Sequence, residues 1–136
     1  MGKKIVITGG IGYIGTELCK IYSGFSWNDE IIVIDNRFIS ERVNQLRNWN
    51  MNFVHGDILD KNLIKKYCQD ADVVHHLAGI TAVPRVKSEA NEEKEKEIER
   101  VAKEGTQNIL DVISNKCKIV MPSTHVIFEG IKDVQE

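Results

Sequence analysis

The 136-residue sequence lacks the features that mark several classes of protein. Its formal net charge is only −2, which gives no broad electrostatic attraction to nucleic acid or to a membrane surface. No apolar run approaches the ~20 residues that a membrane-spanning helix needs, and the N-terminal MGKK leads into an apolar stretch unlike a signal peptide. We therefore expect a cytoplasmic protein with no nucleic-acid or membrane partner.

Metal-binding and disulfide patterns are missing as well. Cys19, Cys68 and Cys117 are an odd number of cysteines without a CxxC spacing, which favours reduced thiols in a cytoplasmic protein. His75 and His76 are adjacent in a predicted strand, so their side chains should point to opposite faces and cannot chelate one metal ion. We expect no metal site.

What the sequence does contain is an alternation of short apolar runs with amphipathic stretches. Predicted strands cover residues 3–9, 30–36, 52–57, 72–79 and 118–124. These runs are rich in Val and Ile and mostly unalternated, as in a parallel sheet that is covered on both faces. With 42% hydrophobic residues and no linker or repeat, the chain is predicted to be one α/β domain spanning residues 1–136.

Four helices are expected between these strands, each with an apolar face. The first should end at Gly24 and bury Ile14, Leu18, Ile21 and Tyr22. The second should be capped by Ser40 and bury Val43 and Leu46. The third should be capped by Asp60 and bury Leu63, Ile64 and Tyr67. The last should carry Ile98, Val101, Ala102, Ile109, Val112 and Ile113 on one face.

The strongest chemical signal is TGGIGYIG, which follows the first predicted strand and opens the first helix. Its glycines Gly9, Gly12 and Gly15 have the spacing of a dinucleotide-binding turn. The first permits a tight turn, the second a close approach to a pyrophosphate and the third helix–strand packing. The phosphates would then lie on the free N–H groups at the helix N-terminus.

Asp35 closes the second predicted strand, where a carboxylate can accept hydrogen bonds from an adenosine ribose. Glycine turn and aspartate together indicate a dinucleotide site. A 2′-phosphate would be repelled by Asp35, so NAD is favoured over NADP. Arg37 leaves the alternative open, because an arginine near this strand end can accommodate that phosphate.

Together these segments resemble the extended short-chain dehydrogenase/reductases, the NAD-dependent nucleotide-sugar epimerases and dehydratases. The resemblance covers the whole chain through TGGIGYIG, VIDN, HGDILD, VVHHLAGITAV, EGTQNIL and PSTHVIFEG. It implies a Rossmann-type doubly wound parallel sheet with strand order 3-2-1-4-5, NAD as cofactor and a nucleotide sugar as substrate of the full-length family.

The resemblance also implies roles for matched residues. The main chain at Tyr13 and Ile14 would contact the pyrophosphate, beside Gly9, Gly12 and Gly15. Asp35 and Asn36 would contact the ribose, Asp57 and Ile58 the adenine, and Leu77, Ala78 and Gly79 would run beneath the cofactor. Thr124 would be catalytic, through a hydrogen bond to the substrate hydroxyl that is oxidised.

One family feature is missing from the sequence. The general base of the family is the tyrosine of a YxxxK motif, whereas Tyr13, Tyr22 and Tyr67 all lack a lysine four positions later. We therefore expect the NAD-binding portion of an epimerase or dehydratase, truncated before the sixth strand and the substrate domain and inactive alone. A non-catalytic dinucleotide-binding or redox-sensing module and one chain of a split enzyme are the alternatives.

The same expectation bears on assembly. Residues 118–124 would form an uncovered edge strand, and an apolar edge of this kind recruits another chain. The sequence thus predicts a homodimer or a higher oligomer.

Overall fold

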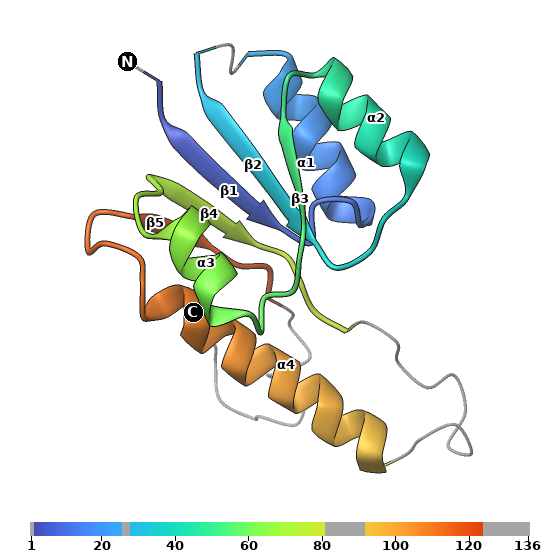
Figure 1. The fold of residues 1–136 in the computed structure, drawn as a ribbon, viewed down its shortest axis with the longest axis vertical. Helices are drawn as coiled ribbons and strands as arrows, with labels where there is room; N and C mark the ends of the chain where they lie inside the picture. Colours follow the sequence, from blue (N-terminus) through green and yellow to red (C-terminus); the bar gives the residue numbers. More distant parts are fainter. Residues whose placement is uncertain (1, 26–27, 81–91, 124–136) are drawn as a thin grey trace, which may run out of the picture.

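Apolar, largely β-branched runs form a parallel sheet at the centre of the molecule (Figure 1). The structure, a computed structural model, describes residues 2–25, 28–80 and 92–123. Within these ranges the strands are β1 (Lys4–Thr8), β2 (Glu30–Asp35), β3 (Asn52–His55), β4 (Val73–His76) and β5 (Lys118–Val120). Their order is β3-β2-β1-β4-β5 and every neighbouring pair is parallel, which confirms the predicted Rossmann-type sheet.

Helices cover both faces of this sheet (Figure 1). The helices α1 (Tyr13–Ser23) and α2 (Ser40–Asn48) pack on one face, while α3 (Lys61–Cys68) and α4 (Glu92–Leu110) pack on the other. Coverage of both faces explains why the strands carry continuous apolar runs rather than alternating ones.

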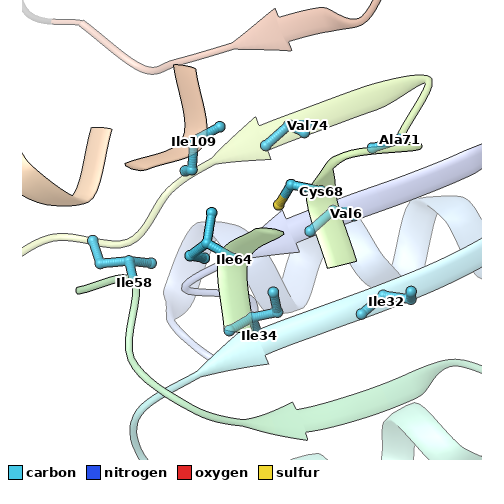
Figure 2. Packing of buried hydrophobic residues seen from close by; sticks show 9 residues of the cluster. All are labelled: Val6, Ile32, Ile34, Ile58, Ile64, Cys68, Ala71, Val74 and Ile109. Carbon is cyan, nitrogen blue, oxygen red and sulfur yellow. The ribbon is translucent and has the colours of Figure 1, made fainter. Parts of the chain in front are cut away.

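Successive side chains of β1 and β2 are buried alternately in two hydrophobic cores, one on each face of the sheet. Figure 2 shows the core on the α3 and α4 face, which is formed by Val6, Ile32, Ile34, Ile58, Ile64, Cys68, Ala71, Val74 and Ile109. The core on the α1 and α2 face is formed by Ile5, Ile7, Ile11, Cys19, Ile31, Val33, Leu46 and Met51. Because side chains alternate between the two faces of a strand, each strand packs against one helix layer on each side of the sheet.

The predicted buried face of α1 is partly wrong. Ile14 and Ile21 are 63% and 56% exposed, although Leu18 and Tyr22 are half-buried as expected. The helix instead meets the sheet through Gly15, which has no side chain, and through the small Cys19, so its backbone can approach the sheet closely.

The last helix also differs from the prediction. α4 ends at Leu110, so Val112 and Ile113 pack on the core from the turn that follows it. Ala102 is exposed, and the buried positions of the helix are Gly105, Asn108 and Ile109. A polar residue and a glycine thus occupy a face that periodicity alone assigns to apolar side chains.

The two predicted helix caps have opposite outcomes. Asp60 caps α3, because its carboxylate accepts the N–H groups of Asn62 and Leu63, each at 3.1 Å. Ser40 is not a cap: it is the first residue of α2, the N-cap is Ile39, and the Ser40 hydroxyl donates to Glu41.

These caps give a paired stability test. Replacing Asp60 by Ala should lower the free energy of unfolding by about 1 kcal/mol, because two N–H groups of α3 lose their acceptor. Ser40→Ala should change it by less than about 0.5 kcal/mol, since no helix N–H depends on that hydroxyl. Urea unfolding of both variants checks this, and equal losses would contradict the assignment of the caps.

Candidate nucleotide-binding site

Hydrogen bonds between neighbouring strand ends gather the predicted site residues at one edge of the sheet. The N–H of Gly9 donates to Ile34 at 2.8 Å, that of Leu77 to Thr8 at 3.1 Å and that of Gly56 to Asp35 at 3.0 Å. The segments that leave β1, β2, β3 and β4 therefore start side by side at the carboxyl ends of the strands. Open α/β sheets bind ligands outside this edge, where the strand order reverses.

The first glycine of the turn is needed where β1 passes β4. Gly9 has a φ of +68°, and a Cβ on it would lie 2.7 Å from the backbone nitrogen of Ala78. Any larger residue would combine a strained conformation with a collision against main chain.

The other two glycines of the turn have different surroundings. A Cβ on Gly15 would lie 2.5 Å from the Cα of Gly10, so this glycine permits the close packing of α1 that the sequence predicts. A Cβ on Gly12 would meet the Gly9 carbonyl oxygen at 3.2 Å, a tight but not prohibitive contact. The space around Gly12 is consistent with a ligand approaching its backbone, although packing within the chain does not require glycine there.

The N-terminus of α1 is open to an anion. No side chain caps it, its first turn contains no acidic residue, and Tyr13 and Ile14 are exposed. The first-turn N–H groups of a helix have no intrahelical acceptor, and the helix dipole adds partial positive charge. In contrast, Asp60 occupies the same position on α3.

Asp35, the last residue of β2, is only 5% exposed and holds the turn in place. One carboxylate oxygen accepts the N–H of Ile11 at 3.3 Å. The other accepts the N–H of Arg37 at 3.0 Å and forms an ion pair with its Nε at 3.4 Å. A carboxylate has about four acceptor positions, so these contacts leave room for a ribose hydroxyl.

Arginines border the turn on the side of α2. The Arg42 guanidinium donates to the carbonyl of Ile11 and lies 5.9 Å from the centre of the Tyr13 ring. The Arg37 guanidinium is half-exposed and lies beside Gly12. Sequence reasoning considered Arg37 but missed Arg42, because a helical arginine gives no signal until the fold brings α2 against the turn.

The segment after β3 is held at the carboxyl edge of the sheet by contacts with α4. Asp57 accepts the N–H of Leu59 at 2.9 Å, while the side chain of Ile58 is buried in the core (Figure 2). The Asn108 side chain donates to the carbonyl of Ile58 at 3.0 Å, and a Cβ on Gly105 would collide with the Ile58 side chain. Sequence reasoning missed both α4 residues, although EGTQNIL was among the segments that carried the resemblance.

The remaining predicted residues differ in exposure. Asn36 and Gly79 are exposed, while Leu77 and Ala78 are half-buried beside β1. Thr124, the predicted catalytic residue, lies outside the described residues.

Other reactive groups of the described chain lie away from this edge or are inert. Burial raises the pKa of the Cys19 thiol to about 12 and that of Cys68 to about 11, which keeps both protonated. Within the ranges that the structure describes, no three His, Cys, Asp or Glu side chains are grouped to hold a metal ion. None of the helices described is both long and apolar enough to cross a membrane.

The glycine turn, the open helix N-terminus and the strand order define a Rossmann-type nucleotide-binding fold. Residues 6–135 match the model of the 3-beta hydroxysteroid dehydrogenase/isomerase family, and the chain belongs to that family. This agrees with the resemblance to the extended short-chain dehydrogenase/reductases.

Several relatives of the chain are nucleotide-sugar enzymes by name. The CDP-paratose 2-epimerase of Salmonella typhi is 34% identical over 141 residues, an alignment that covers 95% of this chain and 39% of the enzyme. The UDP-N-acetyl-alpha-D-glucosaminuronate decarboxylase of Bacillus cytotoxicus is 29% identical over 130 residues, covering 94% of this chain and 38% of that enzyme. The chain thus spans about two-fifths of the length of these relatives.

Solved structures show the same fold. The UDP-glucose-4-epimerase of Stenotrophomonas maltophila, described with NAD and formylated UDP-arabinopyranose bound, superimposes with a TM-score of 0.75 at 19% identity, covering 96% of this chain and 40% of the enzyme. The dTDP-glucose 4,6-dehydratase of Streptomyces venezuelae, described with NAD and TYD bound, gives 0.65 at 25% identity, with 80% of this chain and 35% of the enzyme covered.

The conformation of Gly9 gives a test of the turn. Gly9→Ala should lower the free energy of unfolding by about 2 kcal/mol or more, because the new methyl group meets Ala78 at a positive φ. Gly24→Ala is the matched control, since Gly24 has right-handed backbone angles and its Cβ would be 3.4 Å from the nearest atom. Thermal or urea unfolding should show almost no loss for the control, and equal losses would contradict this account of the turn.

Proposed function

We propose that this chain binds NAD at the carboxyl edge of its sheet and forms the cofactor-binding portion of an NAD-dependent enzyme that acts on a nucleotide sugar. The observation that carries the proposal is the uncapped N-terminus of α1 beside the Asp35 carboxylate. The helix N-terminus would bind the diphosphate of an adenosine diphosphate group, and the neighbouring carboxylate would bind its ribose. The printed names of the relatives support the class of substrate.

The residues present fit this group. The main chain at Tyr13 and Ile14 offers N–H donors for the pyrophosphate, where no side chain competes for them. Asp35 retains acceptor capacity for a ribose hydroxyl, and Asn36 follows it at the exposed edge.

Two further segments complete the proposed site. Asp57 and Ile58 would border the adenine, and residues 77–79 would lie beneath the dinucleotide. Ile58 would contribute main chain only, because its side chain is in the core. The adjacent Arg37 and Arg42 guanidiniums add positive charge toward the phosphates.

When bound, NAD supplies a hydride acceptor for the carbon that carries the substrate hydroxyl. This chain would hold that hydroxyl through Thr124. Removing the hydroxyl proton requires a base, and the sequence contains no YxxxK pair. General acid–base assistance is commonly worth about 10²–10⁴ in rate, so the chain would bind the cofactor without efficient turnover.

Asp35 should decide the affinity and selectivity of binding. We expect the wild-type chain to bind NAD more tightly than NADP, because a 2′-phosphate would face the Asp35 carboxylate. Asp35→Ala should weaken NAD about ten-fold or more, since a hydrogen bond to a charged group contributes about 1.5–3 kcal/mol. Calorimetric titration of both cofactors measures this.

Asp29→Ala is the matched control for that experiment. The Asp29 carboxylate also accepts a backbone N–H, that of Lys3 at 2.8 Å, but at the opposite end of the sheet. The Asp29→Ala variant should bind NAD with the same affinity as the wild type. Equal affinities of the wild type for NAD and NADP would contradict the assignment of NAD.

The missing base gives a second expectation. The 136-residue chain should show no epimerase or dehydrogenase turnover above background on UDP-, CDP- or dTDP-sugars, even when saturated with NAD. NADH absorbance and product chromatography measure this. Clear NAD reduction that disappears in Thr124→Ala would refute it and require another base within the chain.

A further inference from the structure

A chain of three hydrogen-bonded side chains runs through the interior on the α4 side of the sheet. The Thr8 hydroxyl at the end of β1 lies 2.7 Å from Nδ1 of His76 at the end of β4. Nε2 of the same imidazole lies 3.0 Å from the hydroxyl of Thr106 on α4. Thr8 is 0% exposed and His76 is 4% exposed, so water does not compete for the bond between them, whereas Thr106 is half-buried.

The direction of the protons follows from the donors present. The N–H of Ala78 donates to the Thr8 hydroxyl oxygen at 3.2 Å. We infer that the Thr8 hydroxyl donates to the lone pair of His76 Nδ1, since a proton on Nδ1 would leave the Thr8 hydroxyl proton without an acceptor among the described residues. No buried side-chain polar atom of the described residues lacks a partner. His76 therefore carries its proton on Nε2 and donates to Thr106.

The chain of bonds connects segments that border the proposed nucleotide site. Thr8 accepts two consecutive N–H groups of the segment after β4. Its carbonyl accepts the N–H of Leu77, and its hydroxyl oxygen accepts the N–H of Ala78. On the other side of Thr8, Gly9 packs directly against the backbone of Ala78. The imidazole thus holds the Thr8 hydroxyl where it accepts the N–H of Ala78.

The connection extends to the third segment through α4. Thr106 follows Gly105, which packs against Ile58, and one turn later Asn108 holds the Ile58 carbonyl. A single stretch of α4 therefore contacts the segment after β3 and, through His76, the segment after β4.

We propose that His76 is a positioning residue of the nucleotide site, which in its Nε2–H tautomer fixes the segment of residues 77–79 against the glycine turn. It does not touch the nucleotide itself, because its imidazole is buried beneath that segment. This inference rests on the proposed function, since positioning has a meaning only if a nucleotide binds at this edge. Burial lowers the pKa of His76, which favours the neutral imidazole that the arrangement requires.

His75 is a matched control supplied by the same strand. It lies on the opposite face, where Nε2 is 2.7 Å from the hydroxyl of Tyr22 on α1. The bond joins β4 to α1 near the C-terminal end of that helix, and none of the described hydrogen bonds connects it to Thr8 or Ala78. Loss of the His75 bond should affect stability but not the nucleotide site.

The experiment compares NAD affinity and stability across paired variants. His76→Phe and Thr8→Val remove the nitrogen atoms or the hydroxyl at similar volume, and should weaken NAD about ten-fold. Thr8→Ser keeps the hydroxyl and should restore the affinity to within about two-fold of the wild type. His75→Phe should lower the urea midpoint without changing the NAD dissociation constant.

The outcomes separate this inference from the proposed function. A wild-type chain that fails to bind NAD refutes the proposed function and, with it, any positioning role. A wild-type chain that binds NAD, with His76→Phe and Thr8→Val binding equally well, refutes the inference alone. Equal weakening by His75→Phe also refutes it, because the effect would then be one of general stability.

Two further measurements remain decisive if the buried variants do not fold. Thr106→Val removes only the outer hydroxyl and should weaken NAD by about three-fold, whereas unchanged binding would contradict the inference. Heteronuclear NMR of the imidazole nitrogens in the unmodified chain should show His76 protonated on Nε2 and not on Nδ1. A proton on Nδ1 would overturn the proposed arrangement.

Discussion

The close passage of Gly9 against the backbone of Ala78 is the constraint on which the candidate site depends. Main chain meets main chain there, with no space for even a methyl group. This contact brings the segments leaving β1 and β4 together at the carboxyl edge of the sheet. The chain passes from β1 into α1 within a few residues there. The exposed, uncapped N-terminus of α1 follows from that abrupt turn. The candidate anion site at this edge is therefore a product of backbone packing, and side chains only refine it.

Features that depend on local chemistry could be predicted from the sequence. Strand positions follow from runs of Val and Ile, and the Asp60 cap follows from a carboxylate before a helix. The opposite directions of His75 and His76 follow from the period of a strand, since one reaches Tyr22 and the other Thr106. Each depends on neighbours within a few positions, where a sequence pattern carries the physical constraint directly.

Features that depend on how elements meet could not be predicted in the same way. Periodicity assigned Ile14 and Ile21 to the buried face of α1, but a helix that approaches the sheet through Gly15 and Cys19 presents a different face. Ala102 was expected inside, whereas α4 buries Gly105 and Asn108 because Ile58 and its carbonyl occupy the space opposite them. Volume and polarity at a contact are properties of both partners, and only one partner is visible in a local pattern.

The electrostatics of the edge create a competition that bears on which dinucleotide the proposed site would accept. Asp35 is anionic and buried, yet it already receives two backbone N–H groups and the Nε of Arg37. The backbone donors are fixed by the fold, whereas the Arg37 guanidinium is 56% exposed and its ion pair is a long one at 3.4 Å. Only Arg37 is the exposed partner of this pair, since the Asp35 side chain is 4% exposed, so the guanidinium is the group that a ligand would move. On binding, Arg37 would either continue to neutralise Asp35 or turn toward a 2′-phosphate. We propose that the buried carboxylate favours the uncharged ribose of NAD, because turning Arg37 away toward a phosphate would leave Asp35 facing another anion with only main-chain dipoles to offset it.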